Sequence, residues 1–137
     1  MIRWLRRLAM AFVLLYLLAF GALYAAQDVL LFPGWSGPPA ASVASVPGMS
    51  EIAIPGPDGT TLRTWSRPAD PGRPTILFFH GNAGFQWGKL PPLAARGYGL
   101  SLTAYRGFAG NPGDPSEAGL LDDARAALAH LAAAGIA

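Results

Sequence analysis

The chain has 137 residues, of which 52% are hydrophobic and only 13% carry a charge. This composition argues against disorder throughout the chain and against a highly charged nucleic-acid-binding protein. The absence of cysteine excludes a disulfide framework, a thiolate zinc site and a cysteine nucleophile.

The net charge of +2 is concentrated at the N-terminus, where Arg3, Arg6 and Arg7 precede an apolar segment. Residues 27–137 carry seven basic and eight acidic side chains. Phosphate backbones are bound by clustered basic residues on the folded part of a protein, so we expect no nucleic-acid partner.

The first predicted element is a transmembrane helix over residues 8–26, a run of nineteen residues without charge. Such a helix is about 28 Å long, close to the ~30 Å hydrocarbon core of a bilayer. The alternative is a cleaved signal peptide, but Leu23 and Tyr24 occupy positions where its cleavage site needs small residues. We therefore expect a single-pass anchor whose partner is the lipid bilayer.

The arginines predict the orientation of this anchor. Residues 1–7 form a basic N-terminus, and no Lys or Arg follows the apolar run before Arg63. The positive-inside rule places the N-terminus in the cytoplasm and the remaining chain on the outer side. Residues 27–48 are predicted to be a tether, because residues 33–48 contain four prolines and three glycines among small side chains.

Residues 49–137 are predicted to form a partial α/β domain that opens with a hairpin. The strands at 50–54 and 60–66 flank the turn sequence Pro-Gly-Pro-Asp-Gly. The apolar run at 75–79 is typical of a strand buried on both faces. Within 84–96, Gly88 and the pair Pro91-Pro92 confine any helix to short pieces.

The C-terminal part repeats the order of strand and helix. A second buried strand is predicted at 98–105, followed by a Gly/Pro-rich loop at 106–115. A helix then begins with Ser116 as its N-cap and stops at Gly135. Its predicted apolar stripe comprises Leu121, Ala124, Leu128 and Leu131. Alternating strands and helices imply a parallel sheet, with the hairpin adding antiparallel strands at one edge.

The clearest candidate for a functional site is His80-Gly81-Asn82-Ala83-Gly84, directly after the strand at 75–79. Small residues let backbone N–H groups turn toward a cavity at the carboxyl end of a parallel sheet, where open α/β sheets bind ligands. Backbone donors at such a place suit an oxyanion. Taken alone, a His-Gly-Asn turn is more often structural than functional. Its position directly after an apolar strand makes the two roles equally compatible with the sequence.

Three motifs in order resemble the N-terminal half of the alpha/beta-hydrolase serine hydrolases: HGNAG, then YRGF at 105–108, then PSEAGL at 115–120. The most similar subgroup is the single-pass, membrane-anchored one whose eukaryotic members include protein depalmitoylases. The resemblance covers residues 28–137. It implies an α/β fold comprising the hairpin, two parallel strands and helices, preceded by one transmembrane helix.

The resemblance also assigns roles. It makes Asn82 the backbone donor of an oxyanion hole, with Ala83 as neighbour, and gives His80, Gly81 and Gly84 the task of shaping the loop. The nucleophile of these enzymes is a serine in G-x-S-x-G on the strand after the helix that here ends near Ala134, followed by an acid and a histidine.

The 137 residues contain no G-x-S-x-G sequence. Catalytic residues are therefore expected to be absent, the chain alone to be inactive, and the sequence to be part of a longer hydrolase of small acyl substrates. The alternative is a non-catalytic, membrane-tethered binding module.

The remaining polar residues support no other site. Ser36 is interpreted as linker, His130 as a surface or boundary residue, and Asp122 and Asp123 as surface acids near a helix N-terminus. Arg106 is interpreted as a structural brace. Two histidines fifty residues apart do not have the spacing of a metal site, and phosphate-binding glycine motifs are missing. We expect neither a metal nor a cofactor.

Overall fold

The computed structural model describes residues 1–34, 36–38, 40–82 and 84–136. It divides into two units, Met1–Pro33 and Gly34–Ala137, and each is described by itself.

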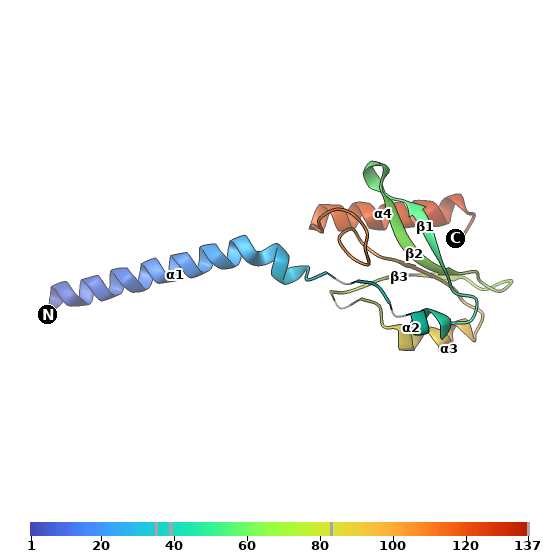
Figure 1. Cartoon of the computed structure of the whole chain (residues 1–137), viewed down its shortest axis with the longest axis horizontal. Coiled ribbons are helices and arrows are strands. Elements are labelled where there is room, and N and C mark those ends of the chain that lie inside the picture. Colours follow the sequence, from blue (N-terminus) through green and yellow to red (C-terminus); the bar gives the residue numbers. More distant parts are fainter. Residues whose placement is uncertain (35, 39, 83, 137) are drawn as a thin grey trace. The chain divides into compact units, whose positions relative to one another are not determined.

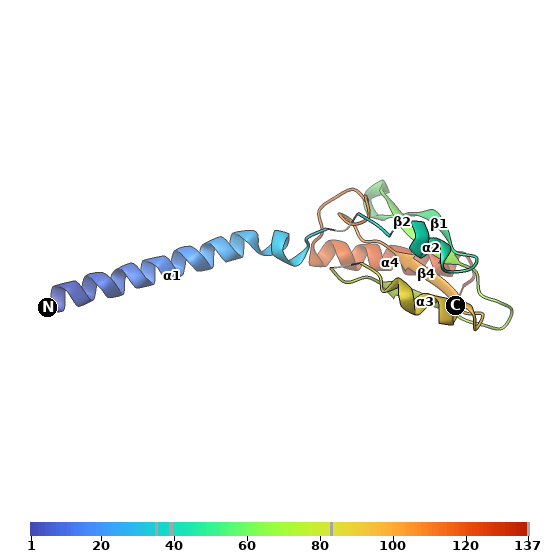
Figure 2. The ribbon, with the colours of Figure 1, turned by 60° about the horizontal axis from the view of Figure 1, so that its bottom comes forward.

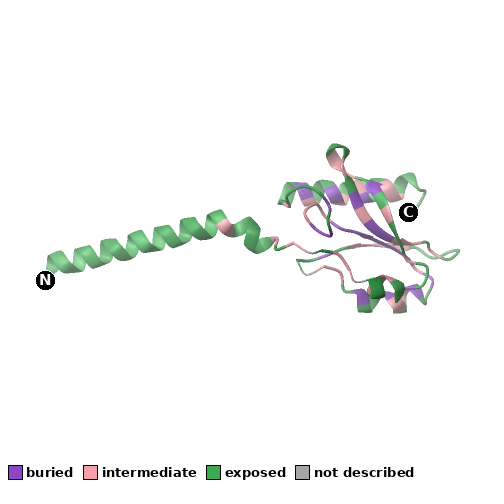
Figure 3. Cartoon of the chain, viewed as in Figure 1, coloured by how far each residue is buried: buried purple, intermediate pink, exposed green. Residues whose placement is uncertain are grey.

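The first unit is one helix, α1 (Ile2–Leu31), in which every residue is exposed except Ala26, which is intermediate (Figure 3). It is long and apolar enough to cross a membrane, a property that a signal sequence shares. The helix extends beyond the predicted run at both ends, because the flanking residues are compatible with helix. It stops at Phe32, the residue before Pro33, where the proline ring disfavours helical backbone.

The second unit is built on a four-stranded sheet in the order β1-β2-β4-β3. Its strands are β1 (Ser50–Pro55), β2 (Thr61–Arg67), β3 (Thr75–Phe79) and β4 (Gly99–Thr103). β2 pairs antiparallel with both β1 and β4, whereas β3 runs parallel to β4. The predicted α/β class, with a hairpin and two parallel strands, is confirmed.

Helices cover both faces of the sheet (Figures 1 and 2). α4 (Glu117–Ala133) lies on one face, while α2 (Ala40–Ala44) and α3 (Leu90–Ala94) lie on the other. Two 3-10 turns, η1 (Pro57–Gly59) and η2 (Trp87–Lys89), complete the elements. The predicted short helical pieces after β3 are η2 and α3, and the two prolines occupy the first turn of α3, where no intrahelical N–H is needed.

Two apolar clusters, one on each side of the sheet, form the core. The larger cluster lies on the α2 and α3 side and includes Trp65, Leu90, Leu100 and Leu102. The smaller lies under α4 and comprises Ile54, Leu62 and Ala127. The strands alternate between the two clusters, as the period-2 pattern requires.

Three expectations about packing are wrong. The segment predicted as a tether contains α2, and Val46 is only 2% exposed in the larger cluster. β3 is only half-buried, because it pairs with β4 alone among the described residues. On α4, Leu121 and Leu128 are 51% and 57% exposed, and the buried face consists of Gly119, Asp123 and Ala127. Small residues form this face because they let the helix lie close to the sheet.

Both ends of α4 agree with prediction. The Ser116 hydroxyl accepts a hydrogen bond from the Gly119 N–H at 3.2 Å. At the other end, Gly135 adopts φ +69°, and the N–H groups of Gly135 and Ile136 bond to the carbonyls of Ala132 and Leu131. This is a Schellman motif, which satisfies carbonyl groups that the helix leaves without partners.

The free side of β3 leads to a prediction about association. An unpaired strand edge is a template for another chain, so the soluble fragment 28–137 should form oligomers in size-exclusion chromatography. Phe79→Lys should reduce them, because Phe79 is 41% exposed and a charge at a strand edge opposes pairing. A monomeric fragment with a cooperative unfolding transition would contradict this prediction.

Candidate functional site

The predicted HGNAG residues follow β3 as a closed turn. The Gly84 N–H donates to the Gly81 carbonyl at 3.0 Å, and Gly84 adopts φ +85°, a conformation that favours glycine. Asn82 lies exposed at the tip, and its N–H takes no part in closing the turn. Ala83 is outside the described residues. The turn therefore lies at the carboxyl end of β3, which runs parallel to β4.

His80 connects the end of β3 with the end of β4. Its Nε2 accepts a hydrogen bond from the Tyr105 N–H at 3.0 Å, which assigns the proton of the neutral ring to Nδ1. Nδ1 then donates to the Gly81 carbonyl at 2.9 Å. Phe85, Tyr105 and Phe108 surround the ring, with centroids 4.7–5.1 Å away. This geometry suits a residue that shapes the turn.

The environment of His80 predicts a pH dependence of stability. Burial lowers its pKa below the ordinary 6.5, and the hydrogen bond to Gly81 opposes this in part. The unfolded chain thus binds a proton more readily than the folded one. The contribution of His80 is present above pH 6.5 and is lost as pH falls toward the lower folded pKa.

We expect the free energy of unfolding of the full chain, in detergent micelles, to decrease between pH 7.5 and pH 5. His80→Gln should flatten this decrease, because glutamine does not titrate. His130→Gln, on the partly buried side of α4, serves as the matched control and should retain it. An equal decrease in both variants would show that other groups cause the effect.

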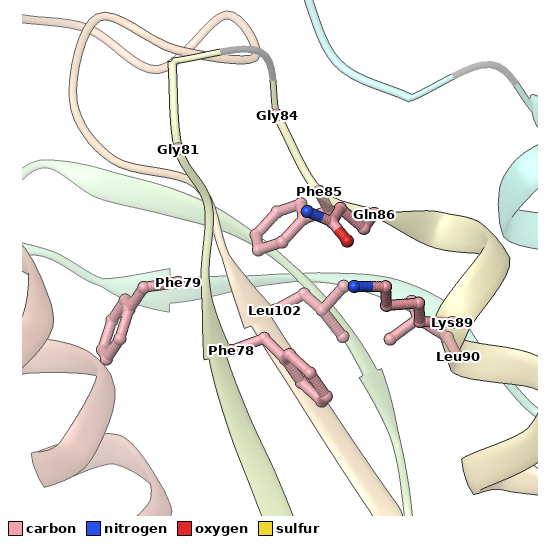
Figure 4. A pocket seen from close by; sticks show the side chains of 9 residues that line it. All are labelled: Phe78, Phe79, Gly81, Gly84, Phe85, Gln86, Lys89, Leu90 and Leu102. Carbon is pink, nitrogen blue, oxygen red and sulfur yellow. The ribbon is translucent and has the colours of Figure 1, made fainter.

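A cavity of about 250 Å³ opens beside the turn (Figure 4). The turn contributes Gly81 and Gly84, and apolar side chains form most of the wall, with one amide and one ammonium group among them. The lining side chains are Phe78, Phe79, Phe85, Gln86, Lys89, Leu90 and Leu102. The volume is slightly below the ~300 Å³ at which typical ligand pockets begin, so the cavity suits a small apolar group.

The backbone that leaves β4 is held by two buried side chains that the sequence did not indicate. Asn111 donates through Nδ2 to the Ala104 carbonyl at 2.7 Å and accepts from the Arg63 N–H through Oδ1 at 2.9 Å. Asp123 accepts from the Arg106 N–H at 2.8 Å. Both fix the strand end that supplies the Tyr105 N–H to His80.

The prediction of Asp123 as a surface acid is therefore wrong. Its side chain is fully buried and accepts from the Arg106 guanidinium through Nη2 at 2.8 Å and Nε at 3.1 Å. The hydrogen bond to Asp123 raises the pKa of Arg106. Arg106 does act as a brace. Asp122 is exposed, as predicted, and pairs with Arg125 at 2.8 Å.

One sequence signal could have identified the buried acid. Gly119 and Asp123 are four residues apart and so share a helix face. A Cβ atom at Gly119 would lie 2.7 Å from Cδ of Arg106, so this glycine makes room for the arginine. A glycine in the first turn, one helical turn before an acid, therefore indicates that a long side chain crosses there.

The other polar candidates lie apart from the turn. Ser36 is outside any helix or strand, and His130 is on α4, partly buried. In the part of the chain that the structure describes, no group of three or more His, Asp or Glu side chains could hold a metal ion.

Comparison with known proteins places this geometry in context. No family model matches the chain. Bem46 of Schizosaccharomyces pombe is 34% identical over 136 residues, which cover 89% of this chain and 45% of that protein. WAV2 of Arabidopsis thaliana, described as alpha/beta hydrolase domain-containing, is 36% identical over 87 residues, covering 59% of this chain and 28% of WAV2. The chain thus spans less than half the length of these relatives.

Solved structures share the fold. An alpha-beta hydrolase from Vibrio vulnificus superposes with a TM-score of 0.60 at 15% identity, over 80% of this chain and 42% of that one. An esterase from Pyrococcus furiosus gives 0.59 at 14% identity, over 73% and 40%. The chain has the alpha/beta-hydrolase fold, and its sequence relatives include Bem46 and an alpha/beta hydrolase domain-containing protein. The HGNAG turn follows β3 of this fold, next to the cavity at the carboxyl ends of β3 and β4.

Proposed function

We propose that the chain is the N-terminal part of a membrane-anchored serine hydrolase that cleaves ester, thioester or amide bonds. The supporting observation is the turn after β3, which the Gly84 N–H closes onto the Gly81 carbonyl and whose two glycines line a mostly apolar cavity. In this proposal Asn82 donates to the negative oxygen of a tetrahedral intermediate, with Ala83 as its neighbour. The cavity accommodates part of a small acyl substrate.

The same proposal makes the 137-residue chain inactive alone. An oxyanion donor lowers a barrier only after a nucleophile has attacked the carbonyl carbon. The sequence offers no G-x-S-x-G elbow. Of the serines that would be candidates, Ser116 caps α4 and Ser101 is buried within β4. Binding without turnover is what these residues support.

A chimera tests this function. Residues 1–137 are joined to the part of Bem46 that follows its aligned segment, and a fluorophosphonate probe and p-nitrophenyl esters are applied. Intact Bem46 and the 137-residue chain alone are the controls. We expect labelling at a single serine in the chimera and in Bem46, and none in the chain alone. Labelling of the chain alone, or of Bem46 but not the chimera, contradicts the proposal.

Membrane anchoring and orientation belong to the same proposal, and they rest on α1 and on Arg3, Arg6 and Arg7. A reporter fused after Ala137 should report the outer side of the membrane. Replacing the three arginines by glutamine should weaken or reverse this orientation, because their charge sets it. Protease protection that places Trp65 and Trp87 on the cytoplasmic side would overturn the topology.

A further inference from the structure

The structure clamps two successive backbone N–H groups at the end of β4. The Tyr105 N–H donates to Nε2 of His80 at 3.0 Å, and the Arg106 N–H donates to Oδ2 of Asp123 at 2.8 Å. We propose that Asp123 is a positioning residue for the HGNAG turn, acting through Arg106, Tyr105 and His80.

The fixed end of this chain of contacts is the Asp123 carboxylate. It is 0% exposed and receives the Arg106 backbone N–H together with Nε and Nη2 of the guanidinium. Charge-assisted bonds from a planar guanidinium hold both partners in one geometry. The Arg106 side chain passes directly over Gly119, which leaves the arginine little freedom to move.

The other end of this chain of contacts is the Gly81 carbonyl. Because Asp123 fixes Arg106, it also fixes the peptide plane that precedes it, and hence the direction of the Tyr105 chain. His80 follows Tyr105 through Nε2, and its Nδ1–H reaches the Gly81 carbonyl at 2.9 Å. That carbonyl also accepts the Gly84 N–H, which closes the turn. The acid thus sets the orientation of a loop that lies on another strand.

This inference rests on the proposed function for its meaning, because the turn matters in catalysis only as an oxyanion hole. Its physical content is the coupling between Asp123 and the His80 ring. That coupling is measurable without any hydrolysis. Asp123 itself touches no substrate in this scheme.

The test measures the imidazole nitrogens of His80 by NMR in the full ¹⁵N-labelled chain, embedded in lipid nanodiscs. A His130→Gln background leaves His80 as the single histidine. The parent should show the Nδ1–H tautomer. Asp123→Asn should raise the share of the other tautomer at least about fivefold, because a neutral amide loses the charge-assisted bonds to Arg106. Hydrogen exchange of the amide of Leu102, a fully buried residue of β4, reports core stability in the same sample.

Asp122→Asn is the matched control, because it removes an exposed carboxylate one residue away and should leave the His80 tautomer unchanged. If Asp123→Asn does not fold, Arg106→Lys replaces it, since lysine keeps the charge but not the planar fork. A variant that accelerates exchange at Leu102 while the tautomer stays unchanged assigns Asp123 a purely structural role and overturns the proposal. An equal response to Asp122→Asn, or an Nε2–H parent, also overturns it.

The result is independent of the hydrolase assignment. If the chimera is inactive but Asp123→Asn still changes the His80 tautomer, the proposed function is contradicted and the positioning role stands. If the chimera is active but the tautomer does not change, the positioning role is contradicted and the proposed function stands.

Discussion

Asn82→Pro in the active chimera is expected to reduce turnover by about 10²-fold or more, because proline has no N–H and one oxyanion donor accounts for this magnitude. The loss should appear in kcat, since the donor acts on charge that develops in the transition state. Steady-state kinetics with a p-nitrophenyl ester measure it. Circular dichroism establishes that the fold survives.

The control for this substitution is Asn82→Ala. The side chain of Asn82 is exposed, and the proposed donor is its backbone N–H, which alanine retains. Asn82→Ala should therefore keep turnover close to that of the parent chimera. If alanine is as harmful as proline, the amide side chain and not the backbone carries the role.

Arg106→Ala is expected to destabilise the fold by about 3 kcal/mol, because it leaves the buried Asp123 carboxylate without its cation. Breaking a buried pair from one side costs more than the pair itself contributes. Guanidinium unfolding followed by tryptophan fluorescence measures the change in the full chain. The unfolding curves should be recorded at high pH, where carboxylates are ionised.

The matched control is Arg125→Ala. Arg125 forms its ion pair with Asp122 at the same distance of 2.8 Å, but both side chains are more than half exposed. Exposed pairs contribute about 0–1 kcal/mol, so this variant should unfold near the parent midpoint. Equal losses in the two variants would contradict the special status of Asp123.

The sequence predicted those parts of the fold that depend on local patterns. The turn cluster at 55–59 indicated the hairpin, and continuous apolar runs indicated β3 and β4. The HGNAG turn was predicted because its glycines and its position directly after an apolar strand can both be identified in the sequence. Each of these signals lies within a few residues of the structure that it predicts.

The failures involve partners far apart in the chain. Arg106 and Asp123 are 17 residues apart, and Asn111 bonds to a strand residue 48 positions away. No periodicity records such pairs. The apolar stripe of α4 was misplaced for a related reason: large side chains dominate a hydrophobicity pattern, whereas the face that touches the sheet is made of Gly119 and Ala127.

The buried pair of Thr64 and Thr103 links two positions that lie 39 residues apart. Their hydroxyl oxygens are 3.0 Å apart where β2 and β4 pair. Replacing one threonine by valine leaves the other hydroxyl buried without this partner, whereas replacing both leaves neither in need of one. Two single changes are thus unfavourable and their combination is nearly neutral. The two positions should therefore covary: related proteins should keep both threonines or replace both together.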